Sequence, residues 1–325
     1  MTKMREATNV SISHTADLNT NYMAVAQKGN VGSKYIYAEQ LRNNQTENHI
    51  LRGYAGNVTT PVLTLYGSAG GHSQTWEYSG RSGKWFVGTK PRTDTKTLWD
   101  KQIARVDIRY NGGSHYSNTD FPRLAYLDRA GADRDHCGSP EDMERSEAAV
   151  SPSYTKFLIA TVETDGTGHF IIYDMDTINN LLDDAESSND YVDLRNVSYL
   201  ESFTVRNFTG DGAIINSVQG YDLDDAGNIY VSSQLAPDFD KNTGKYTAHH
   251  KQIVKIPVNN RQDVSQWETV NLSSDGRLDI TGQHTELEGI QILNENHCYL
   301  TVAYHANVSG KNKTVSNKIF EISWN

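Results

Sequence analysis

Side chains that can exchange hydrogen bonds or protons recur at long, similar intervals in this 325-residue chain. Five of them, each a glutamine or a glutamate, are Gln27, Gln74, Glu147, Gln219 and Glu288. Successive members of this set are 47, 73, 72 and 69 residues apart. Amide and carboxylate groups form paired hydrogen bonds, which suits the recognition of a ligand that is rich in hydroxyl groups.

Each of these residues opens the same local pattern, in which two β-rich segments flank a turn. In the clearest copy, residues 216–234, polar and apolar side chains alternate over 217–223 and again over 229–233. Such alternation is typical of half-buried antiparallel strands, and Gly227 stands where the turn requires a positive φ. The other copies are residues 27–41, 74–90, 147–163 and 288–304. A pattern that recurs in this way predicts a repeat protein.

Five units in 325 residues leave 65 residues for each unit, which is enough for four strands and their connections. This is the size of a propeller blade. After the fifth copy only one further strand, 317–325, is left, so we expect residues 9–16 to supply the missing strand and close the ring. The sequence therefore predicts an all-β fold, a five-bladed β-propeller that spans residues 1–325 as one domain.

The predicted architecture gathers the repeat-opening residues at the central channel, because the innermost strand of each blade lines it. His72 and His284 precede two of these strands at similar points, and Trp76, Tyr221 and Asp222 lie on them. An aromatic face stacks well on the C–H face of a sugar. The candidate ligand-binding residues are therefore His72, Gln74, Trp76, Glu147, Gln219, Tyr221, Asp222, His284 and Glu288.

Two alternatives to direct ligand binding stay open. The polar residues could bond to one another and to channel water, as buried polar groups must, and the aromatic residues could serve sheet packing. Asp222, Glu147 and Glu288 could also act as base, acid and orienting group of a glycosidase. No G-x-S-x-G or H-E-x-x-H motif occurs, and we assign no catalytic residue and no cofactor.

Residues 222–228 begin like a calcium-binding loop, with Asp222, Asp224, Asp225 and Asn228. The bidentate glutamate that such a loop requires is missing, because position 233 is Ser. A hairpin turn explains the same residues, so we predict no metal site. Cys137 and Cys298 are too few for a disulfide framework, and two unpaired thiols are expected.

The net charge of −10 argues against general nucleic-acid binding. Residues 81–109 hold 8 bases and 3 acids, whereas residues 120–201 hold 18 acids and 6 bases. The basic run could steer an anionic polymer and the acidic run could hold a cation, or both could be solvated faces. Residues 176–182 predict a short helix, no apolar run is long enough to span a membrane, and no signal peptide is recognisable.

Seven long segments, in order along the chain, closely resemble the helveticin J family, the large heat-labile bacteriocins of lactic-acid bacteria. They are QKGNVGSKY (27–35), AGGHSQTWE (69–77), KQIARVD (101–107), HYSNTDFPRLAYLDRAG (115–131), AAVSPSYTKFLIATVE (148–163), AHHKQIVKIP (248–257) and ENHCYLTVAYH (295–305). The resemblance runs from near Asn9 to Trp324. It implies a secreted or surface-associated protein that acts on related Gram-positive bacteria.

The family is also distantly similar to the five-bladed propellers of TagC-like proteins and staphylococcal phage receptor-binding proteins. That similarity implies a cell-wall glycopolymer, such as teichoic acid, as the ligand. The resemblance brings no catalytic residues. We therefore expect a bacteriocin that binds the target cell wall through the face at the channel mouth, with a wall-glycan hydrolase and a non-lethal surface adhesin as the alternatives.

Overall fold

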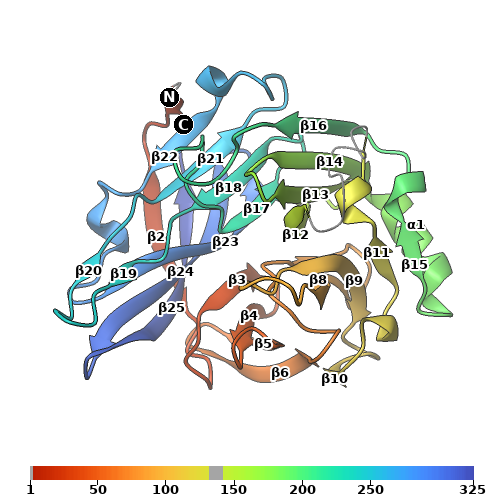
Figure 1. Ribbon diagram of the computed structural model, residues 1–325, viewed down its shortest axis with the longest axis horizontal. Coiled ribbons are helices and arrows are strands. Elements are labelled where there is room, and N and C mark those ends of the chain that lie inside the picture. The colour runs from red at the N-terminus through yellow and green to blue at the C-terminus, as the bar shows by residue number, and fades with distance from the viewer. Residues whose placement is uncertain (1–2, 132–141) are drawn as a thin grey trace.

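Five sheets surround a central axis in the computed structural model, which describes residues 3–131 and 142–325 (Figure 1). In every sheet the strand nearest the axis pairs antiparallel with the strand that follows it in the chain. These five pairs are the five repeated hairpins of the sequence. The predicted five-bladed β-propeller is therefore confirmed.

Blades 1 and 2 each contain five strands. From the axis outwards, blade 1 contains β3 (Ala26–Val31), β4 (Ile36–Arg42), β5 (Glu47–Tyr54), β6 (Asn57–Leu65) and β10 (Gly113–His115). Blade 2 contains β7 (Trp76–Tyr78), β8 (Lys84–Pro91), β9 (Asp100–Asp107), β11 (Arg123–Ala125) and β15 (Tyr191–Asp193). Two short 3-10 helices, η1 (Asn118–Asp120) and η2 (Leu127–Arg129), flank β11.

Blade 4 also contains five strands, whereas blades 3 and 5 contain four each. Blade 3 contains β12 (Met143–Val150), β13 (Lys156–Glu163), β14 (Gly168–Asp174) and β16 (Glu201–Val205). Blade 4 contains β17 (Gly220–Leu223), β18 (Ile229–Ser233), β21 (Gln252–Ile256), β22 (Glu268–Asn271) and β1 (Arg5–Glu6). Blade 5 contains β23 (His284–Asn294), β24 (His297–Val308), β25 (Lys311–Ser323) and β2 (Ser11–Asp17). The remaining elements are the hairpin β19 (Asp238–Phe239) and β20 (Tyr246–Thr247), and the 3-10 helices η3 (Leu194–Asn196), η4 (Val264–Gln266) and η5 (Gly276–Leu278).

The N-terminal strand closes the ring. β2 pairs antiparallel with β25, from Ser11 opposite Ser323 to Asp17 opposite Lys318. The observed strand begins two residues later and ends one residue later than the predicted segment 9–16. Blade 5 thus combines strands from both ends of the chain, and the prediction of closure by an N-terminal strand is confirmed.

Three blades gain a fifth, parallel strand from the segment that leads into the outer strand of the next blade. β10 precedes β11 and pairs with β6, β15 precedes β16 and pairs with β11, and β1 precedes β2 and pairs with β22. Hydrogen bonds replace a strand at the other two junctions. The amide of Val58 donates to Leu18 O at 2.9 Å, and Gln262 Nε2 donates to Thr204 O at 2.8 Å. Each blade is therefore joined to its neighbour at the outer edge.

The single α-helix among the described residues, α1 (Met175–Glu186), lies in the connection between β14 and β16 (Figure 1). Asp174 caps it by accepting a hydrogen bond from the Thr177 amide. Its acids face the basic run of blade 2, since Arg105 Nη2 is 2.5 Å from an Asp183 oxygen and Lys84 Nζ is 2.7 Å from a Glu186 oxygen. The basic and acidic runs of the sequence therefore partly neutralise each other.

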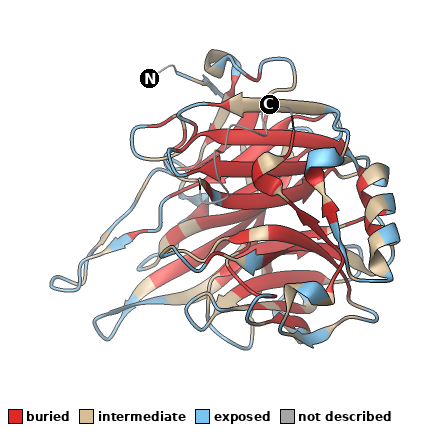
Figure 2. Ribbon diagram, turned by 45° about the vertical axis from the view of Figure 1, so that its right-hand side comes forward, coloured by how far each residue is buried: buried red, intermediate tan, exposed pale blue. Residues whose placement is uncertain are grey.

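The core fills the wedges between neighbouring blades, because each inner strand turns one face to the next blade. Figure 2 shows the strands near the axis buried and the outer connections exposed. Between blades 2 and 3, for example, the rings of Phe86 and Phe157 are 4.7 Å apart. Cys298 is a free, buried thiol, as predicted, whereas Cys137 lies outside the described residues. No helix within residues 3–131 and 142–325 is long and apolar enough to cross a membrane.

Candidate functional site

The five repeat-opening side chains meet near the axis and form what we call the polar ring: Gln27, Gln74, Glu147, Gln219 and Glu288. Gln74 is its centre. Gln74 Nε2 lies 2.8 Å from Gln27 Oε1, 2.9 Å from Glu288 Oε2 and 3.3 Å from Gln219 Oε1. The Gln74 backbone amide donates to Glu147 Oε2 at 3.2 Å. The long sequence spacings therefore did predict a spatial cluster.

Arg145 and His72 complete the hydrogen bonding of the polar ring. Arg145 Nη2 donates to Gln74 Oε1 and to the Gln219 carbonyl, and its Nε is 3.3 Å from Glu147 Oε1. His72 Nε2 lies 3.2 Å from Gln27 Oε1. Burial, with Arg145 nearby, lowers the pKa of His72 to about 3, so the imidazole is neutral at physiological pH.

The hydrogen-bonding groups of the polar ring are mostly buried, although Gln219 is partly exposed and a cavity of about 640 Å³ borders Arg145 at this end. Gln74, Glu147 and Glu288 are only 3%, 1% and 1% exposed. Their polar atoms are hydrogen-bonded to one another or to Arg145 and Thr75. This is the alternative in which the channel groups satisfy each other, and a role of these residues in ligand binding stays a prediction.

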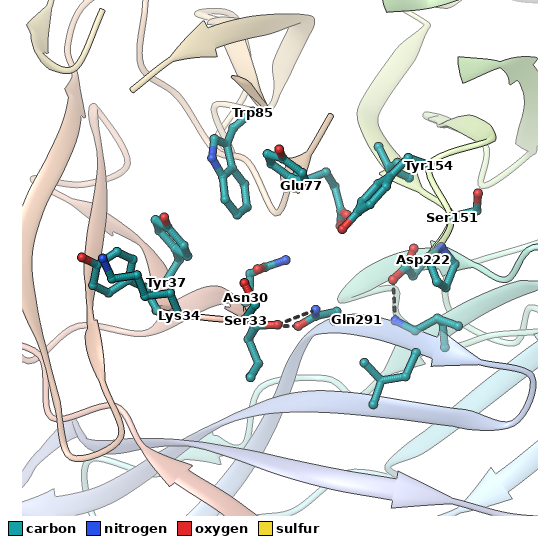
Figure 3. Close-up of a pocket in the computed structure, with 18 residues that line it drawn as sticks. Asn30, Ser33, Lys34, Tyr37, Glu77, Trp85, Ser151, Tyr154, Asp222 and Gln291 are labelled. Atoms are coloured by element: carbon teal, nitrogen blue, oxygen red, sulfur yellow. Dashed lines mark hydrogen bonds between the residues drawn. The ribbon is translucent and has the colours of Figure 1, made fainter. Parts of the chain in front are cut away.

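Open space lies at the other end of the inner strands, in a cavity of about 510 Å³ that we call the aromatic cavity. It is lined where β3, β7, β12, β17 and β23 end, and where β4 and β8 begin. Its aromatic residues are Tyr35, Tyr37, Tyr78, Trp85 and Tyr154. Its hydrogen-bonding side chains are Asn30, Ser33, Lys34, Glu77, Ser151, Asp222 and Gln291. Figure 3 shows Tyr37 and Trp85 on one side, Tyr154 and Asp222 on the other, and Asn30 and Gln291 between them.

The aromatic side chains form a fixed wall and a more exposed rim. Trp85 stacks on Trp76 with ring centroids 4.8 Å apart and an angle of 5° between the planes, and Tyr37 lies 4.6 Å from Trp85. Tyr154 is 45% exposed, and its ring meets the edge of Tyr78 at 5.3 Å. Its backbone φ of +59° is unusual for a non-glycine residue and holds the ring at the cavity rim.

Two carboxyl groups and one amine occupy the buried side of the aromatic cavity. Lys28 Nζ pairs with Glu77 Oε1 and donates to the Ile290 carbonyl at 2.6 Å. Asp222 Oδ2 accepts from the Ile292 amide at 2.5 Å. Burial raises the pKa of Asp222 well above its usual range, and the neighbouring Glu77 raises it further, while Lys28 opposes both. Burial also raises the pKa of Glu77. One positive charge thus faces two carboxyl groups, which favours a retained proton on one of them.

The other predicted residues, Trp76, Tyr221 and His284, take no part in the hydrogen bonding of the polar ring and do not line the aromatic cavity. Trp76 is fully buried behind Trp85 and reaches the aromatic cavity only through that stack. Tyr221 is buried between blades 3 and 4, where its ring centroid is 5.9 Å from the guanidinium carbon of Arg145 and 6.0 Å from the ring of Phe170. Its hydroxyl has no hydrogen-bond partner among the described residues. His284 stacks on Tyr246 at 4.1 Å, beside a different cavity.

The acidic turn after β17 is a hairpin turn, as predicted. Asp224 Oδ1 accepts from the amides of Gly227 and Asn228, each at 2.9 Å, and Tyr230 donates to Asp224 Oδ2 at 2.9 Å. Gly227 adopts the positive φ of +97° that the turn requires. Across residues 3–131 and 142–325, no group of three or more His, Cys, Asp or Glu side chains is arranged to hold a metal ion.

The sequence-based list of candidate residues lacks four that shape the aromatic cavity: Asn30, Trp85, Tyr154 and Gln291. Of these, the sequence indicates only Trp85, as an aromatic residue on or near an inner strand. All four lie at or beside the turn of a repeated hairpin. The search along the sequence concentrated on the residues that open each repeat. The four residues lie 3 to 11 positions after the residues that open the repeats, so the positions around the turns carry the signal for the opposite end of the channel.

Comparison with known sequences settles the family. The family described as "Bacteriocin helveticin-J" matches residues 6–325. A curated relative, bacteriocin helveticin-J of Lactobacillus helveticus, is 55% identical over 342 aligned positions that cover 100% of both chains. The chain belongs to the helveticin J family. The resemblance seen in the seven segments is thereby confirmed over residues 6–325 of this chain.

Solved structures that this helveticin J family member is similar to include the catalytic domain of a GH62 α-L-arabinofuranosidase from Coprinopsis cinerea. That match has a TM-score of 0.46 and 7% identity, and covers 96% of each chain. Another is a GH43_1 enzyme from Xanthomonas citri complexed with xylose, with a TM-score of 0.45, 12% identity, and coverage of 95% and 89%.

Proposed function

We propose that this protein is a secreted or surface-associated antibacterial protein that binds a hydroxyl-rich glycopolymer of the target cell envelope in the aromatic cavity. Membership of a family named for a bacteriocin supports the antibacterial part. The lining of the cavity supports the ligand class. A teichoic-acid-like polymer, with its sugar or polyol units, belongs to that class.

The aromatic cavity has the size and lining that a sugar unit needs. Its volume of about 510 Å³ falls within the range of small-ligand pockets, roughly 300 to 1,000 Å³. Trp85 and Tyr37 are 6% and 7% exposed and are held by their stacking contacts, so a sugar that touches their exposed edges costs little side-chain entropy. Asn30 and Ser33 supply hydrogen-bonding groups at the same opening.

The proposed binding site, the aromatic cavity, lies at the opposite end of the channel from the polar ring, where the sequence had placed it. The polar ring was the sequence-based candidate, but its groups already bond to one another, and all of them except the partly exposed Gln219 are buried. A ligand would have to break those bonds before it made new ones. The observation that carries the proposal is therefore an open cavity with aromatic walls at the opposite end.

Tyr154→Ala tests the proposal with little risk to the fold, because the ring is 45% exposed at the cavity rim. Tyr110→Ala is the matched control, since Tyr110 is 80% exposed and does not line the cavity. Purified cell walls of a susceptible strain are incubated with each variant, and the bound protein is measured in the pellet. We expect about tenfold weaker binding for Tyr154→Ala alone, as for the loss of one stacking contact. Equal binding by both variants would remove the basis for the proposal.

Hydrolysis of the same polymer is a second candidate, favoured by one observation. Asp222 and Glu77 both face the aromatic cavity, and burial raises the pKa of both carboxyl groups. Glycoside hydrolysis uses one protonated and one ionised carboxyl group. Release of soluble sugar from purified walls by the parent protein, abolished in Asp222→Asn, would establish the hydrolase. Wall binding without sugar release by either protein supports the binder.

A further inference from the structure

A second cavity, of about 270 Å³, lies on blade 2 and is lined by three cationic side chains. Lys90 comes from the end of β8, Lys101 from the start of β9, and Arg123 from β11. These strand ends are remote from the β7–β8 turn, whose flanking residues Tyr78 and Trp85 line the aromatic cavity. The remaining lining residues are Gln102, Ala125, Tyr126, Asp128, Met143 and Tyr191. The two cavities therefore share no residue.

Two unfavourable features meet at Lys90. Thr89 pairs with Gln102 and Pro91 pairs with Asp100, so Lys90 takes the register position opposite Lys101, although its amide donates to the Ser68 carbonyl at 2.9 Å and not to the neighbouring strand. Like charges opposite each other destabilise a sheet. Lys90 also has a φ of +60°, a conformation that costs energy for a residue with a Cβ atom. Both costs fall on a residue that faces a cavity, where a bound anion would offset the repulsion.

Arg123 is held in place as a buried, partly free cation. It is 9% exposed, its Nε donates to Gln102 Oε1 at 3.1 Å, and its Nη1 donates to the Asn189 carbonyl at 2.7 Å. Gln102 Oε1 also accepts from Asn118 Nδ2 at 3.1 Å, which fixes its orientation. Arg123 Nη2 donates to none of the described residues. One edge of the guanidinium is therefore anchored, and the other edge remains available in the cavity.

Only one acid lines this cavity among the described residues. Asp128 is buried, and burial raises its pKa, while Arg129 Nε lies 3.4 Å from its Oδ2. A proton on Asp128 would remove its repulsion toward an anion and supply a hydrogen-bond donor. The lining therefore carries a net positive charge in a protein whose overall charge is −10. The rings of Tyr126 and Tyr191 add apolar surface beside the cations.

We propose that this cavity is a binding site for a phosphate group that is attached to a polyol or sugar. Two amines and a free guanidinium edge match the oxygens of a phosphate, and tyrosine rings beside them suit a carbon chain. The site does not depend on what the aromatic cavity binds. The phosphate can come from a free polyol phosphate or from a phosphodiester polymer of the cell wall.

The test uses the whole protein, with the double variant Lys90→Gln/Lys101→Gln and the control Lys311→Gln/Lys313→Gln. The control lysines are exposed at the β24–β25 hairpin, and both variants lose two charges. Calorimetric titration with inorganic phosphate and with glycerol 3-phosphate should give saturable binding at one site, with a Kd of about 1 mM or lower for glycerol 3-phosphate. Binding should weaken at least tenfold in the cavity variant and stay unchanged in the control.

Thermal unfolding gives an independent readout. Without phosphate, the melting temperature of the cavity variant should be no lower than that of the parent, because a like-charge pair has been removed. Added phosphate should raise the melting temperature of the parent and of the control, but not that of the cavity variant. If a glycerol-phosphate polymer binds more tightly than the monomer, the wall polymer is the source of the bound phosphate group. If the two bind equally, the source is a free polyol phosphate. Absence of saturable binding, or the same loss in the control, would overturn the proposal.

Discussion

The two ends of the central channel are built by the same inner strands but differ in how their polar groups are used. At one end these groups are hydrogen-bonded to one another, and at the other end they border a cavity. At the polar ring, Gln74 bonds directly to Gln27 and Glu288, and little is exposed. At the aromatic cavity the strands end in turns, and Trp85 and Tyr154 border open space. Convergence of repeated residues therefore identifies the axis of a propeller, whereas unfilled space beside rigid aromatic rings identifies the better place for a ligand.

The largest effect should come from breaking the polar ring at its cation. Arg145→Met leaves Glu147 without its buried partner and leaves the Val218 carbonyl without its donor, so unfolding should become easier by about 3 to 5 kcal/mol. Denaturant titration measures the change. Arg109→Met, which removes an arginine that is 45% exposed and paired with Asp107, should cost at most about 1 kcal/mol. Equal losses in the two variants would mean that the ring adds nothing to stability.

A smaller effect should appear when pH is varied. Burial raises the pKa of Glu39, Asp100, Asp222 and Glu288 well above the usual value of about 4. The folded protein therefore holds protons that the unfolded chain releases. These groups do not reduce the free energy of unfolding below about pH 4, but they reduce it increasingly as the pH rises through their folded pKa values.

Groups near the surface act in the opposite direction. Lys318 lowers the pKa of Asp17, and its contribution is lost as the pH falls below about 4. Stability should therefore peak in mild acid, and the melting temperature should fall between pH 5 and pH 8. Asp100→Asn should flatten this decline, because neither oxygen of Asp100 has a hydrogen-bond partner among the described residues. A melting temperature that rises toward pH 8 would contradict the assignment.

The smallest effect should come from Glu288→Gln at the polar ring. Burial, with Glu286 nearby, raises the pKa of Glu288, so a neutral amide is better tolerated here than the carboxylate would suggest, and the amide oxygen can still accept from Gln74. The free energy of unfolding at pH 7 should change by less than about 1 kcal/mol. Wall binding should stay at the parent level, in contrast to Tyr154→Ala. If Glu288→Gln loses wall binding while its melting temperature is unchanged, the ligand binds at the polar ring and not in the aromatic cavity.

The sequence made the blades predictable because alternation of polar and apolar side chains is a local property. Residues 217–223 and 229–233 alternate on either side of an acidic turn, and strands β17 and β18 form there. Counting such hairpins gave five blades and an incomplete last one. The ring residues followed, since equivalent positions of repeated blades must approach the axis.

The aromatic cavity was less predictable because its residues come from turns that differ between blades. Tyr154 belongs to the turn SPSYTK, and Gln291 lies near the end of the long strand β23. Only tertiary packing brings these two beside Trp85. The cavity on blade 2 was not predictable for the same reason, since Arg123 lies on a strand of only three residues, which is too short to show an alternation of polar and apolar side chains.

The strands shared between blades also set an order for folding during synthesis. Residues 5–17 are made first, but their partners, β22 in blade 4 and β25 in blade 5, are made last. Until residue 323 has been added, the growing chain carries both an uncovered sheet edge and the strand that will cover it. Sheet pairing between such distant segments is slow and open to competition from other chains. The ring can therefore be completed only after residue 323 has left the ribosome, and residues 5–17 are the segment that a chaperone would have to shield until then.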